Sequence, residues 1–109
     1  MISDMYYTYI IECADNTLYT GVAKILEKRM LVHSKKIKQT AKYTRSHTYK
    51  SLMCAWESID RSTAQKLEYR IKRLTRIQKL ELIENNDNFE VFFPTLDASA
   101  YKRIEKATV

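Results

Sequence analysis

The stretch Leu18-Tyr19-Thr20-Gly21-Val22 holds the only glycine in this sequence of 109 residues. A domain of this length ordinarily carries several times that number. Because glycine is otherwise absent, we expect this one to be required at its position. Either the backbone adopts a conformation that is closed to other residues, or another group approaches the backbone closely. A second tyrosine segment, Thr8-Tyr9-Ile10, precedes it.

The two tyrosine segments lie in a predicted β-hairpin. Residues 5–13 are rich in aromatic and β-branched side chains, and residues 18–23 form a second short strand after turn residues. A two-residue loop, Asp15-Asn16, would place Tyr9 and Tyr19 on opposite faces, because strand side chains alternate. A three-residue loop that includes Thr17 would pair Tyr19 with Cys13 and place both tyrosines on one face. The sequence leaves both alternatives open.

The segment after the hairpin predicts a helix and a third strand. Apolar periodicity indicates a helix over residues 24–35, and Arg29 and His33 are four residues apart, so they lie on one face of it. Residues 36–49 are polar and basic, which predicts a short helix or an ordered loop. Residues 51–57 form a compact apolar run that is typical of a buried strand.

Two capping boxes predict consecutive helices further along the chain. Ser62 with Gln65 would cap a helix over residues 63–74, and Thr75 with Gln78 would cap the next. The inward side chains of these two helices are expected at Ala64, Leu67, Ile71, Leu74, Ile77, Leu80 and Ile83.

These elements predict an α+β fold, in which a small three-stranded antiparallel sheet, made of the hairpin and a third strand, is flanked by helices. Residues 1–86 would form the domain and residues 87–109 a C-terminal extension, with a peripheral helix over 97–106. Cys13 and Cys54 lie inside predicted strands, which favours two reduced, buried thiols over a metal or redox site.

Composition indicates a soluble globular protein, with 45% hydrophobic and 29% charged residues. No segment approaches the ~20 apolar residues that span a bilayer. The first residues lack the pattern of a secretory signal. We therefore expect a cytoplasmic location and no membrane partner.

Charge points to an anionic partner. The chain carries 19 Lys and Arg against 13 Asp and Glu, a net charge of +6. Much of the excess lies in residues 24–50, and a second basic stretch spans residues 70–79. Such a surface attracts phosphate backbones. A merely solvated surface is the alternative, and charge alone does not decide between the two.

Glu68 is the acidic residue in the most unusual predicted position. On the helix over residues 63–74 it falls within the inward arc, one turn after Ala64. A carboxylate that leaves water needs a cation or a hydrogen-bond network. An ion pair with Lys72, four residues on, is the structural alternative to a functional role.

These segments together resemble the GIY-YIG nuclease domain, and most closely its small stand-alone bacterial members. The resemblance covers residues 6 to about 84. The first motif keeps only its tyrosine, and Val22 stands where some relatives have a lysine. The matching segments are Thr8-Tyr9-Ile10, Leu18-Tyr19-Thr20-Gly21-Val22, Glu27-Lys28-Arg29 with His33, Lys42-Tyr43-Thr44-Arg45 and Leu67-Glu68-Tyr69-Arg70-Ile71-Lys72.

The resemblance implies five catalytic residues. Glu68 would be the sole protein ligand of one Mg²⁺ or Mn²⁺, and Arg29 would stabilise charge on the scissile phosphate. Tyr19 would be the general base or would pass its proton to a neighbour. A free phenol loses its proton only near pH ~10, so this role needs positive charge beside it. His33 would accept the proton or position the water, and Tyr9 would orient the phosphate or the water.

Four more residues are implied to contact nucleic acid. Gly21 would let the backbone approach the substrate closely. Lys42, Tyr43 and Arg45 would grip the flanking backbone, with an exposed basic loop as the alternative.

The implied function is metal-dependent endonuclease cleavage of DNA, selective for structure rather than sequence. RNA stays open as a substrate, and a partner protein or a dimer would supply targeting. The competing interpretation is a nucleic-acid-binding module whose cleavage is weak, lost or dependent on a partner.

Overall fold

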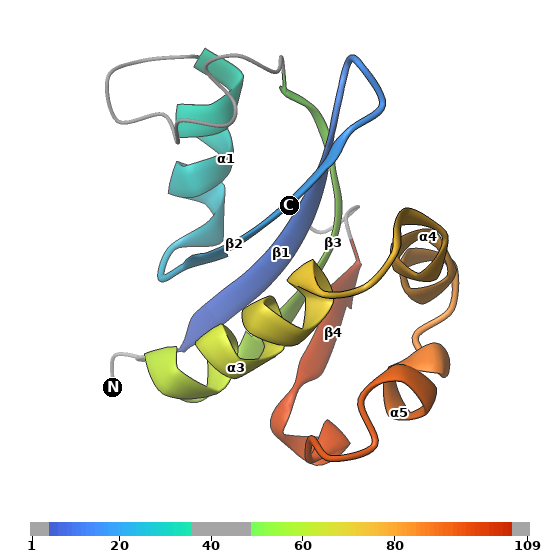
Figure 1. Cartoon of the computed structure of the whole chain (residues 1–109). Helices are drawn as coiled ribbons and strands as arrows, with labels where there is room; N and C mark the ends of the chain where they lie inside the picture. The colour runs from blue at the N-terminus through green and yellow to red at the C-terminus, as the bar shows by residue number, and fades with distance from the viewer. Residues whose placement is uncertain (1–4, 36–48, 106–109) are drawn as a thin grey trace.

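The computed structural model describes residues 5–35 and 49–105, and Figure 1 shows how their helices and strands are arranged. None of the helices in these two ranges has the length and apolar content needed to cross a membrane. In chain order the elements are β1 (Tyr6–Cys13), β2 (Leu18–Ala23), α1 (Leu26–Lys35), β3 (Tyr49–Ser58), α3 (Arg61–Lys72), α4 (Arg76–Glu84), α5 (Asn88–Phe92), a 3₁₀ turn (Ala98–Ala100) and β4 (Lys102–Glu105).

The strands form one antiparallel sheet in the order β2-β1-β3-β4. The predicted α+β class is confirmed, and the predicted number of strands is too low by one. The additional strand, β4, pairs with β3 in the segment 97–106 for which the sequence predicts a peripheral helix. Arg103 covers Trp56 on one face of the sheet and Ile104 packs on the other. The mainly polar composition of the segment conceals this period-two pattern.

Helices cover both faces of the sheet (Figure 1). On the face that carries Tyr9 and Ile11, α1 contributes Leu26 and Met30 to the core. On the opposite face, α3, α4 and α5 pack around Ile10. Both cysteines are buried and neither forms a disulfide, as predicted. The buried residues around Ile10 are Cys54, Trp56, Leu67, Ile71, Leu82, Phe89, Phe93 and Tyr101.

The hairpin register decides which tyrosines share a face. Tyr9 lies opposite Gly21, and Ile11 lies opposite Tyr19. Both tyrosines therefore face α1, as a three-residue loop requires. The loop is residues 14–16, so the partner of Tyr19 is Ile11 and not the predicted Cys13.

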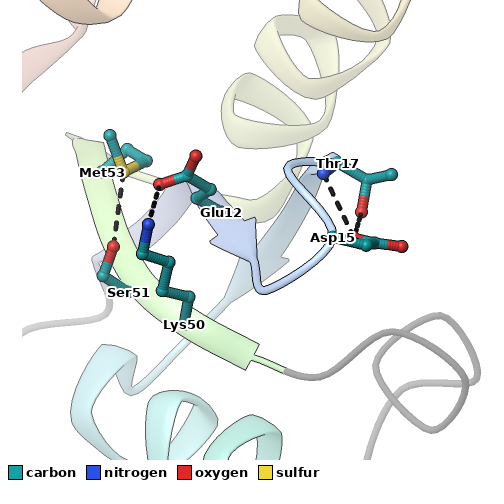
Figure 2. A network of polar contacts seen from close by, with 6 residues as sticks. All are labelled: Glu12, Asp15, Thr17, Lys50, Ser51 and Met53. Carbon is teal, nitrogen blue, oxygen red and sulfur yellow. Dashed lines mark hydrogen bonds and ion pairs between the residues drawn. The ribbon is translucent and has the colours of Figure 1, made fainter.

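Local hydrogen bonds explain this loop. Asn16 has φ of 68°, a left-handed conformation that asparagine adopts more readily than most residues. The Oδ1 atom of Asp15 accepts hydrogen bonds from the backbone N–H of Thr17 at 3.2 Å and from its hydroxyl at 2.6 Å (Figure 2). The turn residues thus close the hairpin in the register that aligns the two tyrosines.

Two irregularities in β3 bring further side chains to the Tyr9 face. Met53 and Lys50 are each skipped in the pairing with β1. Each extra residue reverses the alternation beyond it, so Leu52 and Tyr49 both pack on the side of α1. Lys50 is exposed there, and its Nζ lies 3.6 Å from a carboxylate oxygen of Glu12 (Figure 2).

The predicted capping boxes are half right. The box of Thr75 and Gln78 is present at the start of α4, with both reciprocal hydrogen bonds. The predicted N-cap at Ser62 is wrong, because Asp60 caps α3 and accepts a hydrogen bond from the backbone N–H of Thr63 at 2.8 Å. An aspartate two residues earlier offers an equally good cap, so α3 begins there.

The predicted inward face of α4 is also wrong in part. Ile77 is 70% exposed and Leu80 is 39% exposed, whereas Leu82 is fully buried. Ile83 is partly buried against the core. Because this short helix carries apolar side chains around much of its circumference, their spacing does not identify the buried face.

The C-terminal segment is joined to the sheet by Arg103. Its guanidinium lies over the ring of Trp56, 5.2 Å from the centroid. Its Nη1 and Nη2 atoms donate hydrogen bonds to the carbonyls of Leu82 and Ile83 at 3.3 and 2.7 Å. These carbonyls belong to the last turn of α4, where no backbone N–H is available to them within the helix.

Replacing Arg103 with alanine is expected to lower the free energy of unfolding by about 2–3 kcal/mol, because hydrogen bonds and a cation–π contact are lost together. Urea denaturation followed by Trp56 fluorescence measures the change. The matched control is Lys102→Ala on the same strand, where the side chain is exposed; it should change stability by less than about 0.5 kcal/mol. Equal effects of the two substitutions would contradict the role of Arg103.

Candidate active site

Tyr9 lies at the centre of the candidate site. It is in the middle of β1, is fully buried, and points toward α1. Its phenol oxygen is 2.9 Å from Nε2 of His33, which is also fully buried. A central strand and the helix that covers it therefore hold these two side chains in one hydrogen-bonded pair.

Gly21 makes room for the ring of Tyr9. A Cβ atom at this position would lie 2.5 Å from the Tyr9 hydroxyl oxygen and 2.7 Å from Cζ of the same ring. The φ of Gly21 is not positive, so its backbone conformation is open to other residues. Of the two reasons that the sequence offers for this glycine, close approach is the correct one, and the group that approaches is Tyr9.

Two more aromatic rings surround His33. The Tyr19 ring meets it edge-on, with centroids 5.6 Å apart, and also lies 6.3 Å from the ring of Tyr9. Tyr49 stacks on the imidazole, with centroids 6.3 Å apart and an interplanar angle of 15°. We call Tyr9, Tyr19, His33 and Tyr49 the aromatic cluster.

The sequence analysis missed Tyr49. It lies at the end of a polar, basic segment, outside the apolar run by which we recognised the strand. It reaches His33 because the strand starts two residues earlier than predicted and because the β3 irregularities change its facing. An aromatic residue just before a predicted strand was the available signal.

Burial keeps the Tyr9–His33 pair uncharged. The pKa of His33 is lowered to about 4, mainly by burial and to a smaller extent by the charge of Arg29. The imidazole is therefore neutral at pH 7. Burial, followed by the charge of Tyr19, raises the pKa of Tyr9. The charge of Arg29 and a hydrogen bond with its side chain act in the opposite direction but do not prevent the rise. Both members of the pair are therefore neutral at physiological pH.

The direction of the hydrogen bond between Tyr9 and His33 depends on which ring nitrogen of the imidazole carries the proton. The charge of Arg29 acts on both members of the pair, because it contributes to the lowered pKa of His33 and opposes the raised pKa of Tyr9.

Glu68 approaches from the other face of the sheet. The hydroxyl of Thr8 donates to the carbonyl oxygen of Ala64 at 2.8 Å and ties α3 to β1, and α3 also contacts β2. One turn after Ala64, the Glu68 carboxylate lies 3.2 Å from Nζ of Lys72. The predicted structural alternative is thus present. The charge of Glu68 also raises the pKa of Tyr9, although it is the smallest of the causes. Glu68 is therefore close enough to interact electrostatically with the buried pair.

Exposure divides the five predicted catalytic residues into two groups. Tyr9 and His33 are fully buried. Tyr19 and Arg29 are half-buried, and the Glu68 side chain is 24% exposed. Only the second group can touch a substrate in this conformation. Lys42, Tyr43 and Arg45, predicted to contact nucleic acid, lie outside the described residues.

Glu68 can serve a divalent cation. Its carboxylate is partly open to solvent, and a metal ion would take the place that the Lys72 ammonium now occupies. Residues 5–35 and 49–105 contain no group of three or more His, Cys, Asp or Glu that would form a complete protein cage. Mg²⁺ does not need one, because it is often held by one or two carboxylates together with waters and substrate phosphates. The donors present fit such an ion.

Comparison with known proteins identifies the class. Residues 5–81 match the model of the GIY-YIG catalytic domain, so the chain belongs to the GIY-YIG family. Membership implies a nuclease that acts on nucleic acid, generally with a divalent metal. The fold and the order of the sequence motifs agree with this assignment.

The relatives of this chain are small bacterial proteins. It is 40% identical over 83 residues to the UPF0213 protein OB0043 of Oceanobacillus iheyensis, covering 76% of this chain and 94% of that protein. It is 35% identical over 103 residues to the UPF0213 protein Ent638_3592 of an Enterobacter species, covering 94% and 99%. The solution NMR structure of the UPF0213 protein BH0048 from Bacillus halodurans matches 73% of this chain and 83% of that chain at 32% identity, with a TM-score of 0.47.

Gly21→Ala is expected to lower the free energy of unfolding by about 1–3 kcal/mol, because the new methyl group overlaps a buried ring. Urea denaturation measures the loss. The matched control is Val22→Ala, one residue further along β2 on the opposite face, where removal of a half-buried side chain creates no overlap. In a Tyr9→Leu background the same glycine substitution should cost much less, and an unchanged cost would disprove the contact.

His33 predicts a loss of stability in mild acid. The unfolded imidazole binds a proton near pH 6.5, whereas the folded one binds it only near pH 4. Protons therefore favour the unfolded state between these values. The free energy of unfolding should fall by up to about 1.4 kcal/mol per pH unit from this group. Urea denaturation at several pH values tests it against His33→Gln, which should remove this part of the slope. An identical slope in both proteins would refute the assignment.

Proposed function

We propose that this protein is an endonuclease that hydrolyses phosphodiester bonds in DNA, with one Mg²⁺ or Mn²⁺ held by Glu68. The strongest support for the proposal is that the five predicted catalytic residues divide into an accessible group and a buried pair. Tyr19 and Arg29, which suit a phosphate, and Glu68, which suits a metal ion, remain accessible. Tyr9 and His33 form a buried, hydrogen-bonded pair.

Arg29 and Glu68 supply complementary charges. The guanidinium of Arg29 is planar and permanently charged, which suits the oxygens of a phosphate in the transition state. Glu68 would hold the metal, which when bound would withdraw charge from the phosphate and orient it. A charged donor that is already positioned needs little reorganisation during the reaction.

Tyr19 is the proposed general base. Its phenol is half-buried, as is that of Tyr49, and of these two Tyr19 is the one that the resemblance to the GIY-YIG domain assigns to this role.

Tyr9 and His33 are proposed to position the other residues. Neither is exposed, and a pKa of about 4 makes His33 a weak proton acceptor at neutral pH. Tyr9 instead links the Arg29 side chain to the imidazole. This arrangement would orient the Arg29 side chain toward the substrate. The ring of Tyr19 would be held in place by its contacts with the rings of Tyr9 and His33.

Selectivity for nucleic acid structure is part of the proposal. Targeting would come from substrate shape, a partner protein or a dimer. Cytoplasmic location and the choice of DNA over RNA remain predictions.

The second candidate is a nucleic-acid-binding module with weak or partner-dependent cleavage. The Glu68–Lys72 ion pair favours it, because a carboxylate occupied by an ammonium must be released before it holds a metal. The two candidates differ in metal-dependent product, whereas both predict binding that weakens as salt increases.

The test is a cleavage panel with Mg²⁺ or Mn²⁺ on single-stranded, duplex, flap and branched DNA and on RNA. Glu68→Gln and Arg29→Ala are each expected to lower the cleavage rate by about a hundredfold or more while the protein stays folded. Glu90→Gln, which removes an exposed carboxylate on α5, is the matched control and should keep full activity.

Failure of the wild type to cut any of these substrates would contradict the nuclease proposal. Salt-dependent binding without product would instead support the binding module. Wild-type activity in Glu68→Gln would exclude Glu68 as the metal ligand.

A further inference from the structure

Three cations lie together at the junction of α3 and α4. Lys72 ends α3, with its Nζ 3.2 Å from the Glu68 carboxylate. Arg76 and Lys79 are three residues apart in α4, so they project from one side of that helix. Figure 1 shows the short connection that brings the two helix ends together. We call Lys72, Arg76 and Lys79 the junction cluster.

The cluster concentrates positive charge. Partial burial, followed by the charges of Arg76 and Lys72, lowers the pKa of Lys79, so the three cations repel one another. Within the described residues, no acidic side chain lies within 4 Å of the Arg76 or Lys79 cation. The start of α4 adds the positive end of a helix dipole. An arrangement that repels itself in this way gains stability when an anion binds.

The position of the cluster indicates which anion. Lys72 already contacts the carboxylate that we propose for the metal, so the cluster begins at the edge of the candidate site. From there the cations follow one another along the chain from α3 into α4. A nucleic acid backbone carries a regular row of negative charges. A strand that extends from the candidate site past Lys72 would place its phosphates beside Arg76 and Lys79.

We propose that the junction cluster binds the phosphate backbone of the substrate beside the scissile phosphate. This inference rests on the proposed function, because it takes the site at Glu68 as the place where the strand is cut. It assigns to α3 and α4 a contact surface separate from the α1 side of the site. Phosphate contacts of this kind position a substrate without reading its sequence.

The test measures binding without cleavage. A fluorescein-labelled DNA duplex of about 20 base pairs is titrated in EDTA across a range of salt concentrations. The variant is Arg76→Gln/Lys79→Gln, because glutamine keeps the helix propensity and removes the charge. Lys72 is left unchanged so that Glu68 keeps its partner. The control is Lys66→Gln/Lys102→Gln, which removes the same net charge from exposed positions on α3 and β4.

The junction variant is expected to bind roughly tenfold more weakly at ~0.1 M salt, with a salt slope smaller by about 2, while the control stays near the wild type. Urea denaturation verifies that both variants are folded. Equal losses in the two variants would overturn the proposal, since net charge alone would then explain binding. Unchanged DNA binding with lost binding to polyglutamate would also overturn it and indicate an acidic protein partner.

The binding assay and the cleavage assay test the two proposals separately. Absence of cleavage by the wild type in metal would contradict the nuclease proposal but not the cluster's contact with the backbone, which the EDTA titration measures. Normal cleavage with equal binding losses would contradict only the cluster.

Discussion

The packing of the buried Tyr9 ring on the bare backbone of Gly21 is the contact on which the rest of the site depends. The ring fits only because no Cβ is present, since one would lie 2.5 Å from the hydroxyl. Seated there, the phenol reaches His33 and fixes one side of α1. Arg29 lies on the same helix and interacts with the same phenol. A single glycine thus connects the hairpin register to the position of a cation.

Burial explains why this inner pair carries no charge. An ionised group that leaves water loses solvation, and the protein responds by shifting its pKa toward the neutral form. The shifts of Tyr9 and His33 follow that rule in opposite directions. Charge is kept in the half-buried layer, at Arg29 and Glu68, where water and substrate can reach it. The candidate site therefore has an uncharged buried pair, Tyr9 and His33, and charged side chains that are partly exposed to solvent.

Much of this arrangement follows from the sequence, and the remainder depends on long-range pairing. Strong local signals predicted the hairpin, α1, the core of β3 and the Thr75 cap. The fourth strand was missed because β4 is held by a cation over Trp56 and by pairing with β3, neither of which a local pattern contains. In the candidate site, the resemblance to the GIY-YIG domain implied that Tyr9 and His33 belong to one site. Tyr49 was missed, since its position before the predicted strand was a weak signal and bulges in β3 determine its direction.

The sheet order also bears on the proposal that two helices on opposite faces serve one phosphate. Arg29 lies on α1 and Glu68 on α3, with the sheet between these helices. Groups on opposite faces of a sheet can meet only around its edge, and β2 is an edge strand that carries Tyr19 and contacts α3. In the described sheet β2 has no further strand beyond it. The site that we propose for Tyr19, Arg29 and Glu68 would therefore lie at this edge.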